Sequence, residues 1–500
     1  MERGKAPSLK LFNLRVLPLF AAFLILGIFC VKLTAWVVSI VVIAAILFLF
    51  FLRKVRFVKT KLAVLLLIAL AVGYVSAATT LYFRNEVGLS GEHTVTCRVI
   101  EVTQNDDESY TVTADYLKRG NAYYVGKASF TTTQAVNAGD RLSLKGNVVI
   151  NRLSLDSFYT ALSYRKGTKY SIDSPDVLSA KSGAAPLRHT IRTKVRSVLL
   201  KAEGDRAGGF SYAMLFGDAD FMNEADKSAM REVGVAHVIA VSGLHVGVLT
   251  GILLFLLRKL RVKDKASVFI LLPILGFYAY LANFTPSVLR AAIMGILAVA
   301  ASALGERYDD ASSLSFAAVL ILLVKPLYLF DLSFVMSFLA IFGIQTLARP
   351  VERTLQRRKV NPRLASGIAL SLSTTLALVP LSALVFGRVA LAGLALNLVV
   401  VPLASLTFVL TVFAVLFTLA IPTFGVTLSV ISYFPAAIMD LSAKTADLGL
   451  IAKHDFSAVE LALYYATLLF VGKYCLAYRR VKLIVAGFGL CILTLLLFVA

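Results

Sequence analysis

The sequence is short of charged residues, cysteines and histidines. Asp, Glu, Lys and Arg make up only 16% of its 500 residues, against about 25% in soluble globular chains. This shortage excludes an ordinary soluble enzyme of several domains. Four cysteines without a C-x-x-C pair exclude a disulfide framework and a cysteine zinc site. Five histidines without an H-x-H-x-D-H cluster exclude a two-metal nuclease of that kind.

Apolar residues are abundant instead. They form 58% of the chain, and the mean hydropathy is +0.80. They occur in runs close to the ~20 residues that a helix needs to cross ~30 Å of hydrocarbon. We therefore expect a polytopic α-helical membrane protein with about 13 spans. The candidate spans are 16–31, 33–52, 62–82, 235–257, 268–283, 286–304, 312–330, 333–348, 364–386, 391–420, 424–444, 457–473 and 483–499. The segment 391–420 is too long for one span and contains Pro402, so we expect a broken helix or a re-entrant segment there.

The net charge of +22 is concentrated in five basic clusters that adjoin apolar runs. These clusters are 3–15, 53–61, 258–265, 349–363 and 473–482. With a cytoplasmic N-terminus, all five fall on the cytoplasmic side, as the positive-inside rule expects. The charge therefore predicts a multi-pass protein of the cytoplasmic (inner) membrane and is only weak evidence for nucleic-acid binding.

A segment of different composition lies between the third and fourth spans and is expected outside the cytoplasm. Residues 95–99, 110–116 and 142–150 alternate apolar and polar side chains, and Gly120-Asn121 suits a turn. This pattern predicts a small antiparallel β-barrel or sandwich, of which an oligonucleotide-binding (OB) barrel is one form. The expected divisions are N-terminal membrane helices (1–84), an OB-like extracytoplasmic β domain (85–180), a basic connector (181–234) and a transmembrane domain (235–500).

The β domain and the connector carry the residues that suit a nucleic acid. The β domain has equal numbers of basic and acidic residues, so its aromatic residues either fill the core or stack on bases. These aromatic residues are Tyr110, Tyr116, Tyr123, Tyr124, Phe130, Phe158, Tyr159, Tyr164 and Tyr170. In the connector, Arg188, Arg192 and Arg196 recur every four residues and would line one helix face. They are candidate contacts to phosphate, either of DNA or of lipid headgroups.

The fourth span opens with two histidines, His237 and His245, on either side of Ser242. Ionisable groups at membrane depth are costly, so they line a polar path or pair with neighbours. On one continuous helix all three would share a broad face. The helix lacks the carboxylate of a helical metal site, and Ser242 lacks an oriented base, so we expect no metal, cofactor or catalytic role. Pore lining and interhelical hydrogen bonding remain open.

Two further features belong to the transmembrane domain. Gly243, Gly247 and Gly251 form a G-x-x-x-G-x-x-x-G row, which we expect to let another helix backbone approach closely. Arg290 is either a single steering charge in a pore or the buried partner of an acid such as Asp331 or Asp309.

Several motifs resemble those of the ComEC-type competence proteins. The stretch 237–247 (HVIAVSGLHVG) is similar to their H-L/V-L/I-A-I/V-S-G-L-H-V-G motif. The elements L-x-G-D and P-S-x-x-R-A have counterparts at 215–218 and 286–292, and the D-P-x-F-Q-L-S-F region resembles 326–338. The late P-L, F-G and N-L-x-x-x-P-L run resembles 379–403. Residues of these motifs outside the fourth span are Gly217, Asp218, Pro286, Asp331 and Pro402.

The resemblance implies an inner-membrane channel that moves single-stranded DNA into the cytoplasm during natural transformation. The path would be lined by His237, Ser242, His245, Arg290 and Asn397. Its partners would be single-stranded DNA, the lipid bilayer and other competence-machinery proteins, including a separate nuclease, with a homo-oligomer as one option. Many members end in a metallo-β-lactamase-like domain, and we expect a short form without it because the chain stops after an apolar run. Lys325 stands where Asp is common in the family, and we assign it no role.

The leading hypothesis is therefore a DNA channel without enzymatic activity. A small-solute or lipid transporter, or an envelope-maintenance protein of the same fold, suits broken helices and intramembrane His and Arg equally well. A zinc-dependent membrane hydrolase is the third hypothesis, and it predicts a bound metal.

Overall fold

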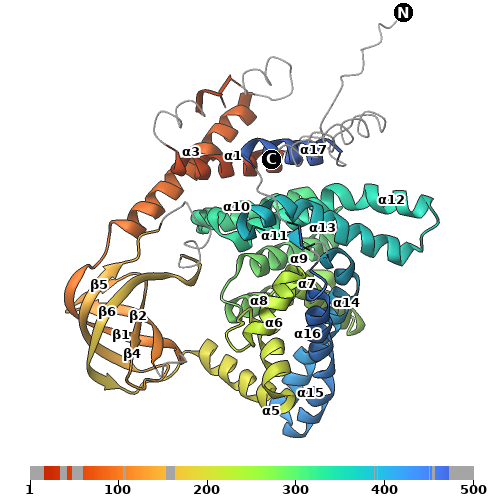
Figure 1. Ribbon diagram of the computed structural model, residues 1–500. Coiled ribbons are helices and arrows are strands. Elements are labelled where there is room, and N and C mark those ends of the chain that lie inside the picture. The colour runs from red at the N-terminus through yellow and green to blue at the C-terminus, as the bar shows by residue number, and fades with distance from the viewer. Residues whose placement is uncertain are drawn as a thin grey trace, which may run out of the picture.

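The computed structural model describes residues 16–33, 42–44, 46–47, 60–104, 109–153, 164–387, 389–390, 392–449, 451–452 and 457–471. It shows a helical bundle with a small β-barrel at one side (Figure 1). The predicted spans 33–52 and 483–499 lie wholly or mostly outside the described residues, as do Phe158 and Tyr159.

Three helical elements precede the barrel in the described chain. They are α1 (Val16–Phe29), η1 (Cys30–Lys32) and α3 (Thr60–Asn85). α1 and α3 pack closely because Gly27 faces the Leu70 backbone and Gly73 faces the Leu24 backbone, where any side chain would collide. Small residues thus permit a close helix contact in this part of the molecule.

A closed β-barrel follows α3. Its strands are β1 (Gly91–Gln104), β2 (Tyr110–Arg119), β3 (Ala122–Tyr124), β4 (Lys127–Thr132), β5 (Arg141–Ile150) and β6 (Thr168–Lys181). The order is β1-β5-β6-β4-β2, and β2 pairs with β1 to close the barrel, while β3 extends the β2 hairpin. β4 and β6 run parallel, and all other pairs are antiparallel. The predicted small β-barrel is confirmed, with one parallel pair among its strands.

The barrel core comes from the alternation of the strands. Val95, Val99, Val112, Leu144 and Val148 all point inward and have no exposed surface. Burial of each such side chain contributes about 1.5–3 kcal/mol to the hydrophobic free energy of folding. The alternating sequence pattern therefore predicts this interior correctly.

The alternation fails at Tyr116. A register shift between Thr96 and Arg98 on β1 marks a β-bulge, and Tyr116 opposite it has a φ of +52°. The bulge turns Tyr116 outward, to 62% exposure, and Leu117 fills the interior instead. The alternation predicted for 110–116 is therefore wrong at Tyr116.

Two helices and a short turn connect the barrel to the bundle: α5 (Leu187–Phe216), α6 (Glu224–Glu232) and η2 (Ala236–Val238). α5 bends at Gly204, whose φ of +77° favours glycine. The side chain of Asn223 caps α6 by accepting the N–H of Ala225 at 3.0 Å.

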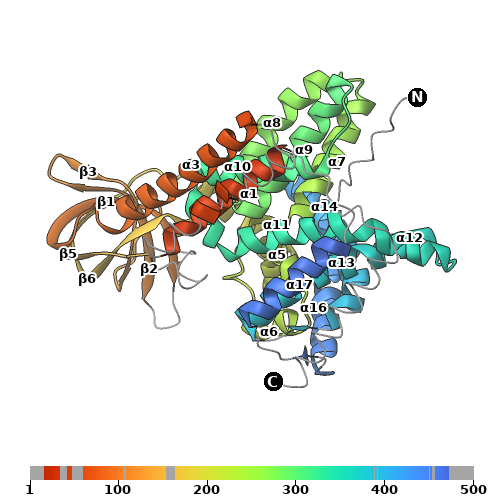
Figure 2. The ribbon, with the colours of Figure 1, turned by 90° about the horizontal axis from the view of Figure 1, so that it is seen from above.

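The remaining chain forms the helical bundle. Its first part is α7 (Gly243–Lys259), α8 (Asp264–Leu281), α9 (Pro286–Leu304), α10 (Asp310–Val324), η3 (Pro326–Phe330), α11 (Leu332–Gly343), the π-helical η4 (Ile344–Ala348), α12 (Arg349–Arg357) and α13 (Pro362–Phe386). Its second part is β7 (Val389–Ala390), α14 (Ala392–Ala420), η5 (Pro422–Phe424), α15 (Gly425–Ile431), α16 (Tyr433–Ala446), β8 (Ile451–Ala452) and α17 (Ala458–Val471). The barrel lies on one side of this bundle, and α12 projects from another (Figures 1 and 2).

Seven described helical segments are long and apolar enough to cross a membrane. They are Lys61–Asn85, Asp264–Leu281, Pro286–Leu304, Leu332–Arg357, Pro362–Phe386, Ala392–Ala420 and Pro422–Ala446. The chain is thus a multi-pass membrane protein, and the predicted 13 spans stay a prediction. The segment 391–420 corrects one expectation, because α14 continues unbroken through Pro402. A proline removes a single backbone hydrogen bond, which packed helices at this depth tolerate.

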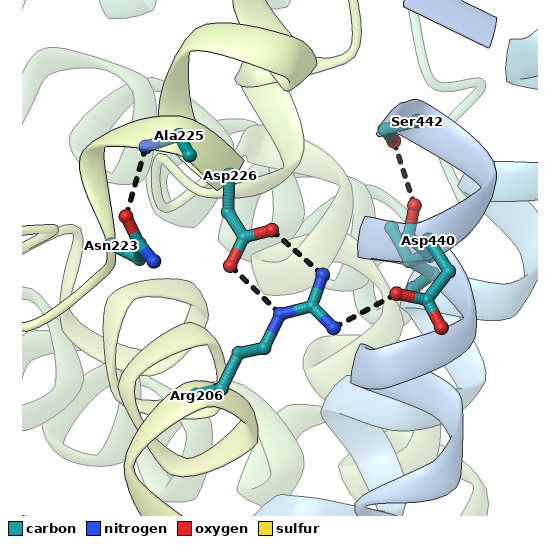
Figure 3. A network of polar contacts seen from close by, with 7 residues as sticks. Arg206, Asn223, Ala225, Asp226, Asp440 and Ser442 are labelled. Atoms are coloured by element: carbon teal, nitrogen blue, oxygen red, sulfur yellow. Dashed lines mark hydrogen bonds and ion pairs between the residues drawn. The ribbon is translucent and has the colours of Figure 1, made fainter. Parts of the chain in front are cut away.

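An ion-pair network fastens the connector to the bundle. Arg206 of α5 donates two hydrogen bonds to Asp226 of α6, at 2.9 and 2.8 Å, and one to Asp440 of α16 at 2.8 Å (Figure 3). The bidentate geometry with Asp226 is the stronger form of such a pair. The network therefore fixes the connector against a helix more than 200 residues later in the chain.

Candidate functional site

The stretch 237–247 does not form one helix. His237 lies in η2, and the chain bends before α7 begins at Gly243. Ser242 is the N-cap residue of α7, and its Oγ accepts the N–H of His245 at 3.4 Å. Ser287 of α9 fastens the bend by donating to the Val241 carbonyl at 2.8 Å. The expectation of one continuous helix is therefore corrected, because a serine N-cap followed by glycine starts a new helix here.

Gly243 makes room for a buried arginine. A Cβ atom on Gly243 would overlap with Nη2 of Arg290, and the Cβ atom of Ala291 would lie 3.5 Å away. Arg290 comes from α9 and is only 5% exposed. The first turn of α7 and the guanidinium of Arg290 therefore lie in direct contact.

Arg290 has few partners. Its Nε donates to Ser337 Oγ at 2.9 Å, and the guanidinium lies 6.0 Å from the ring centre of Phe338. No acidic residue forms an ion pair with Arg290 in the part of the chain that the structure describes. The two expected partners are engaged elsewhere: Asp331 caps α11 and lies 3.6 Å from Arg165, and Asp309 caps α10.

The two histidines have different surroundings. His245 is 1% exposed and stacks on Phe408 of α14, with ring centres 4.6 Å apart. Its Nδ1 atom has no hydrogen-bond partner among the described residues. His237 is exposed at the preceding bend and has a hydrogen bond with the Gly234 backbone. Asn397 of α14 has a buried Oδ1 without a partner, and no described hydrogen bond joins it to either histidine.

Within the described part of the chain, the glycine row of α7 has no close contact with another helix backbone. Nothing within 4 Å would meet a Cβ atom on Gly247 or Gly251 among the described residues. Close helix contacts occur instead at Gly27, Gly73 and Gly343, the last of which faces Ser373 and Ala377 of α13. Among the described residues, Gly243 contacts the Arg290 side chain and nothing meets Gly247 or Gly251, so the packing role of the glycine row stays a prediction.

The three connector arginines line a pocket between the barrel and α5. The pocket is lined by Ile100, Glu101, Val102, Thr103, Arg188, His189, Arg192, Thr193, Arg196, Tyr212, Asp218, Asp220 and Phe221. Arg188 donates to Asn283 Oδ1 at 2.7 Å, and Arg196 lies over the Phe221 ring at 4.4 Å. The spacing of four residues places all three on one side of α5, as the sequence predicts.

Arg192 is already neutralised within the chain. Its Nη2 forms an ion pair with Asp218, its Nε donates to Tyr212 Oη at 3.0 Å, and Glu101 of the barrel lies 3.9 Å away. Burial, reinforced by Asp218, raises the pKa of the neighbouring Asp220. The predicted phosphate contact is therefore corrected for Arg192, whereas for Arg188 and Arg196 it stays a prediction.

The remaining motif residues shape the backbone. Gly217 ends α5 with a φ of +72°, a conformation that favours glycine. Pro286 occupies the first turn of α9, where its missing N–H has no cost. Asp331 caps α11 by accepting the N–H of Ser333 at 2.8 Å, and Pro402 is exposed on α14. Gly217, Pro286 and Asp331 therefore mark the ends and starts of helices.

The described residues show neither a metal cluster nor a serine directed at a base. Among the described residues, no group of three or more His, Cys, Asp and Glu side chains could hold a metal ion. Ser242 Oγ is directed to the α7 backbone rather than to a base. Sequence reasoning missed Ser337 and Phe408. Ser337 lies inside the segment 326–338 that resembles a family motif, whereas nothing in the sequence distinguishes Phe408 from other apolar residues.

Fold and site together define a multi-pass membrane protein with an inserted β-barrel and a buried arginine at a helix start. The model of the Competence protein family matches residues 214–478, more than half of the chain. The chain therefore belongs to the ComEC-type competence protein family. All candidate residues of the transmembrane domain lie within the matched range, whereas the three connector arginines and the barrel aromatic residues precede it.

Three relatives are similar to parts of the chain. The ComE operon protein 3 of Bacillus subtilis is 35% identical over 27% of this chain and 18% of its own length. The Recombination protein 2 of Haemophilus influenzae is 26% identical over 45% of this chain and 30% of its own length. An uncharacterized protein of Aquifex aeolicus is 28% identical over 48% of this chain and 52% of its own length. The chain thus spans about half or less of each relative, and no solved structure matches it.

Proposed function

We propose that this chain forms a membrane path for single-stranded DNA during natural transformation. The observation that supports the proposal best is the start of α7, a helix turn inside an apolar bundle. Ser242 caps this turn by accepting the N–H of His245, and the buried Arg290, which has no ion-pair partner among the described residues, contacts it at Gly243. A moving strand needs a polar path with few fixed charges, because many arginines would bind its phosphates too tightly. In this proposal His237 of η2 and Asn397 of α14 also belong to the lining of the path.

The barrel, in this proposal, is an OB-like domain that presents the strand. Its five main strands follow the order β1-β2-β4-β6-β5 around a closed barrel, with one parallel pair. Tyr116 and Tyr123 are exposed, and cations lie over both rings: Arg98 at 4.5 Å and Lys118 at 5.0 Å. Exposed aromatic rings beside basic groups are the features that stack bases of single strands.

This function requires an extracytoplasmic barrel and a cytoplasmic N-terminus. Cys97 cannot report the barrel's side, because it is 4% exposed and burial raises the pKa of its thiol to about 12. Val125 is 88% exposed at the β3–β4 turn. A Val125→Cys variant should be labelled in intact cells by an impermeant thiol reagent, above the background of the unaltered protein. Labelling only after lysis would contradict the proposed topology.

The chain, as we propose it, has no catalytic activity of its own, and a separate nuclease supplies the single strand. Two observations support this view: Ser242 Oγ is directed toward the α7 backbone, and His245 Nδ1 has no hydrogen-bond partner among the described residues. Elemental analysis of the purified protein tests it, since a stoichiometric zinc ion would favour the hydrolase hypothesis.

Uptake of labelled DNA in a deletion strain tests the whole proposal. Strains complemented with His237→Ala or Arg290→Gln should bind DNA at the surface but internalise at least about tenfold less, the equivalent of one contact to a charged group. Arg258→Gln is the matched control, because Arg258 lies at the exposed opposite end of α7. Unchanged uptake in the uncomplemented deletion strain would favour a small-solute or lipid transporter instead.

The barrel's role has a separate test. A Tyr116→Ala/Tyr123→Ala variant should bind single-stranded DNA at least about tenfold more weakly, because each lost stacking contact costs about 1–3 kcal/mol. Val125→Ala is the control, since it removes an exposed apolar side chain from the same hairpin. Equal binding of single-stranded DNA by the unaltered protein, the double variant and the control would contradict a role of these barrel residues in DNA binding.

A further inference from the structure

At the start of α7, two positive charges lie side by side without a described negative charge between them. A helix N-terminus bears about half a positive elementary charge. The guanidinium of Arg290 lies against this turn, in the space that a side chain of Gly243 would fill. Arg290 is 5% exposed, and no acidic residue pairs with it among the described residues. A buried positive charge beside a second positive charge is costly unless an anion accompanies both.

The same geometry supplies the donors for an anion. The first N–H groups of a helix have no acceptor within the helix, and Ser242 caps only that of His245. The Nε of Arg290 donates to Ser337, and its two terminal nitrogens have no hydrogen-bond partner among the described residues. Helix N-termini and arginine forks are the two groups that proteins combine to bind phosphate.

We propose that Arg290 and the first turn of α7 form a binding site for one phosphate-type oxyanion. Its occupant on the proposed DNA path is a backbone phosphodiester, and this identity rests on the proposed function. The site binds each phosphate transiently, because one arginine and one helix end supply its charge. Gly243 is a positioning residue, since any larger side chain would displace the guanidinium.

Thermal unfolding of the purified full chain in a phosphate-free detergent tests the site. Inorganic phosphate, or a short oligothymidylate, should raise the Tm of the unaltered protein by about 2–4 °C at saturating concentration. Arg290→Gln and Gly243→Ala should each abolish this rise, while Arg258→Gln should keep it. Without anions, Arg290→Gln should melt at the same temperature as the unaltered protein or higher, because it removes an uncompensated buried charge. This last comparison also shows that the variant folds.

The outcomes separate the site from the function. An equal rise of Tm with phosphate in Arg290→Gln would overturn the site. If only phospholipid vesicles give an Arg290-dependent rise, the oxyanion site stands and its occupant is a lipid headgroup. If the rise of Tm with phosphate depends on Arg290 but the Arg290→Gln strain takes up DNA normally, the oxyanion site is supported and the proposed DNA path is contradicted. Lost uptake with an unchanged phosphate effect would support the path and overturn the site.

Discussion

Two buried arginines occupy opposite electrostatic situations in this protein. Arg192, at the junction of barrel and connector, is 8% exposed, and Arg290, against α7, is 5% exposed. Arg192 has Asp218, Glu101 and Tyr212 around it, whereas the described neighbours of Arg290 are Ser337, the Phe338 ring and Tyr308, with no ion-paired acid among them. Arg192 therefore completes an internal network, and Arg290 requires a partner from outside the described chain. Burial alone does not distinguish a structural arginine from a binding one; the presence of acids around it does.

The largest expected loss of stability comes from replacing Arg192, the arginine that forms ion pairs within the chain. Arg192→Gln would leave Asp218 partly buried without its cation, and breaking such a pair costs about 3–5 kcal/mol. We expect a marked fall of Tm and of protein level in the membrane. The Arg192→Gln/Asp218→Asn double variant should recover part of the loss, because both charges are then gone. If Arg192→Gln is as stable as Arg290→Gln, the contrast between the two arginines disappears.

The sequence predicts this contrast only in part. Period-two alternation predicts the barrel interior, and long apolar runs predict the membrane helices, because both patterns reflect burial of one face or of a whole segment. The β-bulge at Tyr116 and the new helix start at Gly243 depend on local hydrogen bonds that the periodicity does not encode. Arg192 pairs with Asp218, and Arg290 pairs with no acid in the described chain. Both outcomes depend on tertiary neighbours from distant parts of the chain.

His245 extends the comparison to a neutral side chain of α7. Because His245 stacks on Phe408 and is 1% exposed, His245→Ala should leave a cavity and cost about 2–4 kcal/mol. His245→Phe should keep the stacking and the protein level, so it isolates the imidazole. Reduced DNA uptake in His245→Phe at normal level would assign the imidazole to the path. Full uptake in His245→Phe would assign His245 to packing alone.

Glu203 in the connector gives a pH-dependent effect of smaller size. Burial raises the pKa of Glu203 from 4.5 to about 7, opposed by a hydrogen bond from Ser211. The folded state therefore favours the protonated form, and this contribution to stability is complete below pH 4.5 and is lost as the pH rises toward 7.

Glu203→Gln keeps an acceptor for Ser211 without the charge. It should unfold like the unaltered protein at pH 5 but be more stable by about 1–3 kcal/mol at pH 8. Glu92→Gln, on an exposed part of the barrel, should show no such difference between the two pH values. Equal stability of Glu203→Gln and the unaltered protein at pH 8 would show that the carboxylate is solvated in the folded state.

The smallest expected effect concerns Gly247, one turn beyond the contact between Gly243 and Arg290. Nothing described lies within 4 Å of a Cβ atom on Gly247, so Gly247→Leu should change stability by less than about 0.5 kcal/mol. Gly343→Leu is the contrasting variant, because Gly343 faces Ser373 and Ala377 of α13, and overpacking there costs about 1–3 kcal/mol or more. Membrane protein level and Tm measure both. A loss of Gly247→Leu protein comparable to that of Gly343→Leu would mean that a further helix, from this chain or another copy, packs on the open side of α7. In that case the space beside Arg290 would be bounded by protein on that side as well, and the route of an anion to the site would have to come from the His237 bend.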